Sequence, residues 1–229
     1  MSFSEKPDYY KLASENSGLT LKSSSRNKSA SLAEAKDQHG DVIASQIFGE
    51  VSAPNCSYEV KKDINLSTIK LGQISVEDGK SFILSSISVN TSPATVPTLE
   101  VSGEQVEDGA DAGTTIEIPA ITLSKWHDAQ IFAEAFSLGG EGCYLNGCNY
   151  TFVCDVTKGT VNGEIVSHDV SNGRIECQVS IVQSGTAEPS IVCGEGWEMT
   201  APLTNDNPDA DYPTWSCTVR KVLKSAHEE

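Results

Sequence analysis

The 229-residue chain carries 32 acidic and 16 basic residues, which gives a formal net charge of −16. This charge excludes a protein that grips nucleic acid electrostatically, because phosphates would be repelled, and it argues against docking on an anionic membrane. The 18 glycines, with many serines and threonines, favour strands and turns over a helical bundle. The longest apolar runs are far shorter than a bilayer span, so we expect no membrane anchor, and we expect no secretory signal at the polar N-terminus.

The first 36 residues differ in composition from the remainder of the chain. They hold six basic and four acidic residues, a net charge of +2, so residues 37–229 carry −18. The run Ser23–Ser29 has no apolar side chain, which is typical of an extended arm, although a plain disordered terminus is an alternative. We therefore expect an N-terminal arm over 1–36, which buries no core of its own, and a folded domain over 37–229.

Short alternating segments predict strands through the first half of the domain. The predicted strands are 42–48, 56–60, 69–74, 82–89, 98–101 and 116–118. A loop is expected at Ala53–Asn55 and a tight turn at Asp78–Gly79. The stretch from Gly103 to Gly113 is rich in acid and glycine, which predicts a solvated loop.

Three Asn-Gly pairs mark the second half of the domain. Asn162-Gly163 lies between two alternating segments and is a strong hairpin signal, whereas Asn146-Gly147 and Asn172-Gly173 are less well framed. These signals predict strands at 149–157, 159–162, 164–169, 173–183 and 214–223. Ser124–Leu138 has the spacing of a helix, although alternation there also permits a strand. The fold class predicted is mainly β: an antiparallel sandwich or barrel with one short helix and the extended arm.

The seven cysteines are predicted to be free thiols, because their number is odd and no secretion signal is expected. Cys154, Cys177 and Cys217 each alternate with apolar neighbours, which indicates buried strand positions. Cys143, Cys148 and Cys154 could form a zinc site, but their spacing lacks a paired knuckle and a nearby histidine. We therefore expect no bound metal.

No constellation of catalytic residues emerges. Ser167, His168 and Asp169 are consecutive on a predicted strand, so their side chains alternate in direction and cannot act in series. His127 and Asp128 lack a third group. We therefore expect neither enzymatic activity nor a cofactor.

Two ligand sites of other kinds remain as alternatives. The oxygen-bearing residues of Asn205–Asp211 alternate as in calcium loops, but the EF-hand glycine and the final glutamate are missing, which favours a solvated loop. Among the tryptophans, Trp197 lies in an evident loop and could contribute to a sugar platform, whereas Trp215 shares the face of Cys217 and is expected in the core.

Acidic residues concentrate in the middle of the chain, where Glu100–Asp211 holds nineteen of them against Lys125, Lys158 and Arg174. In a monomer this surplus serves solubility. Around a channel it would keep a phosphate backbone off the wall. The candidate lumen-facing acids are those of the predicted loop, namely Glu104, Glu107, Asp108 and Asp111.

The arrangement as a whole resembles the tail tube proteins of tailed bacteriophages. The similar features are a serine-rich arm, the turn "HGDVIAS" at 39–45, a mid-chain helix, the hairpin segment 158–185 and the closing segment 194–223. The resemblance implies a virion structural protein, assembled in the bacterial cytoplasm into stacked hexameric rings. It also implies contacts with other tail proteins, a channel through which DNA passes without specific binding, and an arm or loop that reaches the next ring. The alternatives are a capsid decoration or other tail or baseplate component and, in a different class, a carbohydrate-binding or adhesin-like β-sandwich.

Overall fold

The computed structural model describes residues 6–61, 64–91, 96–111, 113–119, 122–123, 134–162 and 164–223. The elements in chain order are α1 (Leu12–Glu15), β1 (Leu19–Lys36), β2 (Val42–Val60), β3 (Ile64–Asn65), the 3-10 turn η1 (Leu66–Thr68), β4 (Lys70–Leu71), β5 (Ile74–Glu77), β6 (Lys80–Thr91), β7 (Thr98–Gln105), β8 (Ile116–Glu117), β9 (Thr122–Leu123), β10 (Phe136–Gly139), β11 (Cys143–Val161), β12 (Glu164–Gln183), β13 (Ser190–Cys193), β14 (Trp197–Asn205) and β15 (Thr214–Val222).

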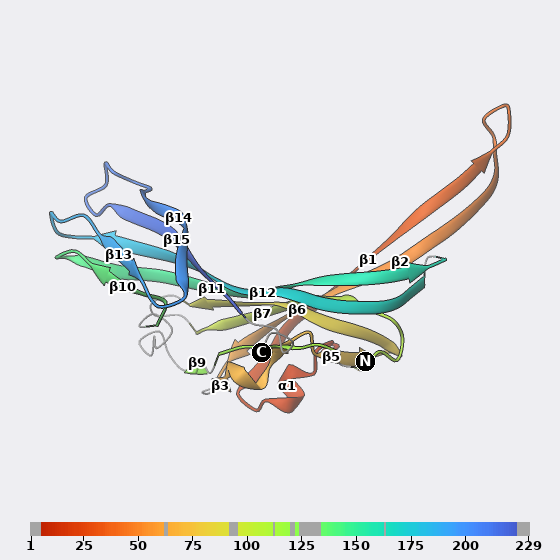
Figure 1. Cartoon of the computed structure of the whole chain (residues 1–229), viewed down its shortest axis with the longest axis horizontal. Helices are drawn as coiled ribbons and strands as arrows, with labels where there is room; N and C mark the ends of the chain where they lie inside the picture. Colours follow the sequence, from red (N-terminus) through yellow and green to blue (C-terminus); the bar gives the residue numbers. More distant parts are fainter. Residues whose placement is uncertain are drawn as a thin grey trace, which may run out of the picture.

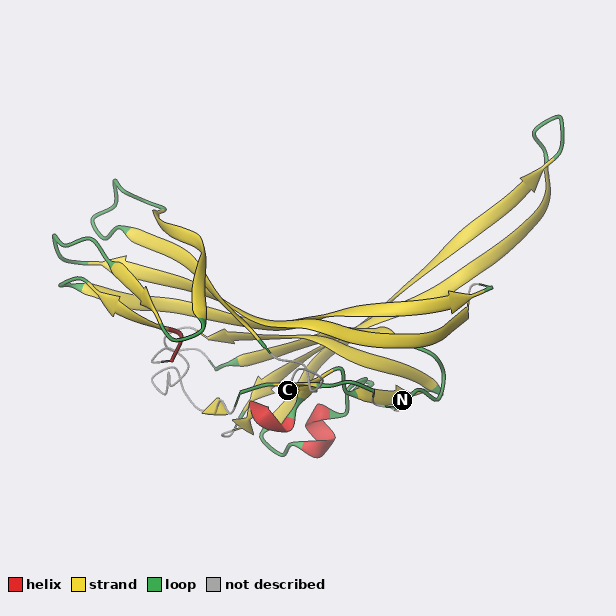
Figure 2. Cartoon of the chain, in the orientation of Figure 1, coloured by secondary structure: helices red, strands yellow, loops and turns green. Residues whose placement is uncertain are grey.

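One long antiparallel sheet organises the molecule (Figure 1). It has nine strands, in the order β1-β2-β7-β6-β11-β12-β15-β14, with β5 paired to β6 off this path. The short pair β3-β9, together with α1, lies beneath its middle, and β10-β13 lies at one end; β4-β8 is a further two-stranded pair. Strands dominate the chain, as Figure 2 shows. The predicted mainly-β, antiparallel, sandwich-like fold is therefore confirmed.

The N-terminal segment is anchored to the body, and the prediction that residues before 37 bury no core is wrong. Tyr9, Tyr10, Leu12 and Leu19 are buried. The Tyr9 ring meets that of Phe82 edge-on, with centroids 5.7 Å apart, and the Tyr10 hydroxyl donates to the Pro54 carbonyl at 2.9 Å. The aromatic pair at 9–10 supplies apolar area that the polar average of the segment conceals.

Residues 19–60 form a long hairpin that projects from the body (Figure 1). β1 pairs with β2 from Leu19↔Val60 to Lys36↔Val42, with three register shifts along the way. The boundary expected after residue 36 therefore falls at the hairpin tip, where Gly40 has a φ of 90°. The loop predicted at Ala53–Asn55 is wrong, because these residues pair with β1 and, at Asn55, also with β7.

The second long hairpin, β11-β12, confirms one Asn-Gly signal and corrects two. Asn162 turns between the strands with a φ of 51°, whereas Gly163 lies outside the described residues. Asn146-Gly147 and Asn172-Gly173 lie inside the strands, where the register shifts. Both pairs supply a local irregularity to a continuing strand, as bulges do, and end no strand.

The helix predicted over Ser124–Leu138 is wrong at its end. Phe136–Gly139 form β10, which pairs with β13 from Phe136↔Cys193 to Gly139↔Ser190. Residues 124–133 of that prediction lie outside the described residues, as do His127 and Asp128. Pairing with a strand more than fifty residues away decided the conformation here, and the alternation noted in the sequence agrees with it.

Candidate functional site: the open polar face of the sheet

The two faces of the long sheet differ sharply in chemistry. One face carries the core, as in the cross-strand row Tyr58, Leu99, Val89, Tyr150, Cys177 and Val219. The adjacent row points to the opposite face and crosses seven strands from β2 to β14. Its members are Ser57, Glu100, Ser88, Thr151, Glu176, Arg220 and Glu198. Every residue of this second row is polar.

A flanking row continues the same surface, which we call the open face. Its members are Glu59, Thr98, Asn90, Asn149, Gln178, Thr218 and Ala201. All residues of both rows are half-buried or exposed. Small hydroxyl and amide side chains dominate, so the surface is suited to water and offers no apolar patch of the kind that binds partners.

The charges of the open face are mostly paired. The Arg220 guanidinium donates to Glu198 Oε1, with Nε at 3.0 Å. Arg174, on the strand next to β15, donates to Glu176 Oε1 at 3.2 Å and lies 3.4 Å from Asp155. Hydrogen bonds from Asn172 and Arg174 lower the pKa of Asp155, so this carboxylate is ionised. Glu100, by contrast, is exposed between Ser57 and Ser88.

The predicted lumen-facing acids lie at the end of β7 and in the turn that follows. Three of the four meet a side chain from a neighbouring strand: Glu104 pairs with Lys158, Asp108 pairs with Lys80 at 2.7 Å, and Glu107 contacts the His168 ring. Asp111 is exposed. The sequence placed the four acids together correctly, but it did not reveal that bases from β6, β11 and β12 meet them. Whether they face a channel stays a prediction.

Lys158 and His168 are themselves a directly opposed pair of the β11-β12 hairpin. They therefore approach Glu104 and Glu107 together. We call these two contacts, which join the hairpin to the end of β7 and the turn after it, the clasp. The His168 ring nitrogen Nδ1 is 2.6 Å from Glu107 Oε1, and the His168 side chain is 6% exposed. Ser167 and Asp169 do not join it, since each lies on the exposed side of the strand.

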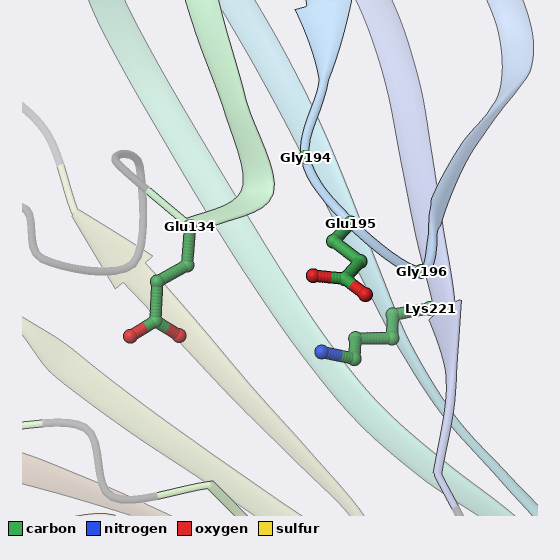
Figure 3. A pocket seen from close by; sticks show the side chains of 5 residues that line it. All are labelled: Glu134, Gly194, Glu195, Gly196 and Lys221. Carbon is green, nitrogen blue, oxygen red and sulfur yellow. The ribbon is translucent and has the colours of Figure 1, made fainter.

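A shallow hollow of about 570 Å³ lies where β10, β13, β14 and β15 converge. Figure 3 shows Glu134, Glu195 and Lys221 around it, with Gly194 and Gly196 supplying backbone. Two carboxylates and one ammonium make the wall charged, whereas small-molecule sites are mostly apolar with a few converging polar groups. The hollow offers no base beside a nucleophile, so we assign it no chemistry.

The geometry does not strengthen the case for the two alternative ligand sites, the calcium loop at Asn205–Asp211 and the sugar platform at Trp197. Asn205 Oδ1 accepts from the Asn207 amide at 3.1 Å and Asp206 Oδ1 accepts from Ser216 at 3.0 Å, so both oxygens are engaged in the turn itself. Trp215, which was expected in the core, is half-buried and packs against it, and Trp197 begins β14 and also packs against the core, so its prediction as a loop residue is wrong. Within the described ranges, no three His, Cys, Asp or Glu side chains are grouped so as to share a metal ion.

Sequence reasoning missed the two sheet edges and the exposed end of the first hairpin. β1 and β14 end the strand order, so each has one edge with no strand beside it in the part of the chain that the structure describes. Near the hairpin tip Leu32 is 60% and Ile43 is 68% exposed, and Val42 is also exposed. Exposed apolar groups on a projecting two-stranded ribbon are typical of a protein contact.

No protein-family model matches the chain, and no curated protein matches it significantly. Among the described residues, no helix is both long enough and apolar enough to cross a bilayer.

Proposed function

We propose that this chain is a virion structural protein, a tail tube subunit that associates with copies of itself into stacked rings around a DNA path. The observation that carries the proposal is a long sheet whose two end strands, β1 and β14, each have an edge that no other described strand pairs with. Proteins that stay monomeric cover or blunt such edges, because an unpaired edge is a template for another strand. Joining the edge of one copy to the opposite edge of the next is a head-to-tail contact, which closes into a ring when the rotation permits.

The projecting hairpin supports a second contact of the same assembly. Its end carries exposed Leu32, Val42 and Ile43. Basic and acidic side chains nearly balance along it, since residues 19–60 hold four of the former and five of the latter. The contact would therefore be made by the exposed apolar groups, which another copy of the chain would cover.

The open face suits the wall of a conduit. A polar surface with few unpaired cations gives phosphates no sites to hold, so DNA would slide past it. Glu104 belongs to the same sheet and Glu107, Asp108 and Asp111 follow it in the next turn, although three of these four acids are paired. A capsid decoration protein would share the hairpin contact but needs no extended polar wall.

Electron microscopy of the purified chain tests this proposal directly. We expect rings or tubes, whose yield rises with salt as the Debye length falls below about 10 Å and repulsion between acidic bodies weakens. Isolated discs that never stack would favour the decoration alternative. A protein that stays monomeric at high concentration and across all salt conditions would contradict self-assembly.

A further inference from the structure

Two buried thiols from neighbouring strands lie in unusually close contact. Cys148 is on β11 and Cys177 on β12, and they are diagonal neighbours on the core face, since Cys148 opposes Val179 and Cys177 opposes Tyr150. Their Sγ atoms are 2.8 Å apart, and the residues are 1% and 0% exposed. Backbone pairing on both sides holds the two Cα positions in register.

This separation sets the pair apart from an ordinary packing contact. Unbonded heavy atoms in a core are optimally separated by about 3.5–4.0 Å, whereas a disulfide bond measures about 2.05 Å. The separation of the two sulfurs therefore exceeds a disulfide bond length by less than one ångström. Other thiols point at backbone oxygens: Cys143 donates to the Ala187 carbonyl at 3.4 Å and Cys154 to the Ser85 carbonyl at 3.6 Å.

We propose that Cys148 and Cys177 are an oxidisable pair, which closes to a cross-strand disulfide when the protein meets a low-molecular-weight disulfide. The thiolate of one cysteine attacks the reagent, forms a mixed disulfide and releases one small thiol. The thiolate of the other cysteine then attacks the protein sulfur and displaces the second small thiol. Both cysteines are oxidised, the reagent is reduced to two thiols, and each thiol proton ends on a released small thiol.

Burial makes the first step slow and the second step fast. Desolvation raises the pKa of the Cys148 thiol well above its usual value, and the neighbouring Cys177 raises it further. Reaction with an outside reagent therefore waits for β11 and β12 to separate locally. Once one sulfur is derivatised and the strands close again, the other sulfur lies against it. In a reducing cytosol the pair stays as thiols, and in an oxidising environment it cross-links the neighbouring strands β11 and β12.

The experiment treats the folded full-length protein with 4,4′-dithiodipyridine and follows thiopyridone release and intact mass. An isolated cysteine keeps the reagent and gains mass, whereas closure of the proposed pair releases two thiopyridones and removes two hydrogens, so that any gain in intact mass comes from the cysteines outside the pair. Peptic digestion in acid, without reductant, then locates the bond. We expect a Cys148–Cys177 cross-linked peptide and a shift of urea unfolding to higher concentration, which dithiothreitol reverses.

Matched variants keep the result interpretable. Cys217→Ala removes another buried cysteine, on β15, and should leave the cross-link intact, whereas Cys177→Ala should abolish it. Stable adducts on Cys148 and Cys177, or a bond to a different cysteine, would overturn the proposal. The proposal would also be overturned if Cys148 and Cys177 stayed reduced at urea concentrations at which the amides of β11 and β12 exchange with solvent.

Discussion

His168 Nδ1 and Glu107 Oε1 are 2.6 Å apart, and this contact ties the β11-β12 hairpin to the turn after β7. The residues are sixty-one positions apart in the chain. Among the described residues no donor reaches the other carboxylate oxygen of Glu107, which is buried. His168 is thus the hydrogen-bond partner that compensates the burial of this acid, and it is part of the architecture rather than of a catalytic triad.

Replacing His168 with alanine should lower the free energy of unfolding by about 1–3 kcal/mol, because Glu107 would lose the group that satisfies it. Urea denaturation measures the change. The control is His39→Ala at the exposed hairpin tip, for which we expect a change within about 0.5 kcal/mol. Equal effects of the two variants would show that the clasp contributes nothing.

Local patterns in the sequence predicted the elements whose determinants are also local. The Asp78-Gly79 turn is present, with φ values of 51° and 71°, and the strand placed at 214–223 corresponds to β15. Alternation also located the buried cysteines correctly, since Cys154, Cys177 and Cys217 are all in the core. Each of these features depends on residues within one short segment.

Structural features that depend on contacts between residues distant in the chain could not be predicted from local sequence patterns. Proline is typical of loops, yet Pro54 lies within β2, where its carbonyl oxygen accepts a hydrogen bond from the Tyr10 hydroxyl. The ion pairs of Glu104 and Glu107 depend on how β11 and β12 fold back over β7. The open face could not be recognised before strand order was known, because its rows join residues from seven strands.

Gly103 should not tolerate even a methyl group. A Cβ there would lie 1.8 Å from the Ile83 carbonyl oxygen and 2.8 Å from the Tyr10 hydroxyl, and the former is backbone that cannot turn aside. Gly103→Ala should cost about 3 kcal/mol through overpacking. Gly147→Ala is the matched strand control, since its nearest neighbour is the Ser180 Cβ at 3.8 Å, and its stability should change by no more than about 1 kcal/mol. Thermal unfolding distinguishes the two, and a stable Gly103→Ala protein would mean that β6 and β7 are farther apart than described.

Buried thiols predict a loss of stability in alkali. Burial raises the pKa of Cys154 to about 12 and that of Cys217 to about 11. Because the thiols hold their protons more tightly when folded, the stabilisation is complete below the unfolded pKa of about 8.5 and is lost as pH rises through the folded values. The free energy of unfolding should therefore fall between about pH 9 and 12, and Cys154→Ala should flatten the slope. A slope unchanged in that variant would assign the loss to other groups.

The outer part of the first hairpin should be dispensable for folding and needed for assembly. Replacing residues 32–47 with an Asn-Gly turn leaves Ser31 and Phe48 as the flanking pair, and none of the residues 32–45, whose burial the structure describes, belongs to the core. We expect unfolding to change within about 0.5 kcal/mol, while sedimentation shows loss of rings and tubes. Leu32→Ser with Ile43→Ser keeps the length and tests whether the apolar side chains carry the contact. Normal assembly of both variants would exclude the hairpin from the interface.

The open face can be tested as the wall of a DNA path by changing its charge. Glu100→Lys with Asn149→Lys raises the net charge of this face by three, at two exposed positions. Glu188→Lys with Thr186→Lys adds the same charge in the exposed loop between β12 and β13.

Subunits are assembled in the presence of short duplex DNA and then treated with nuclease. If the open face lines the channel, the first variant should retain protected DNA, because phosphates bind lysines inside the tube, and protection should fall when salt is raised during assembly. The wild type should retain none, and the loop variant should hold only DNA that the nuclease removes. Protection by the loop variant instead would place the open face on the outside of the tube.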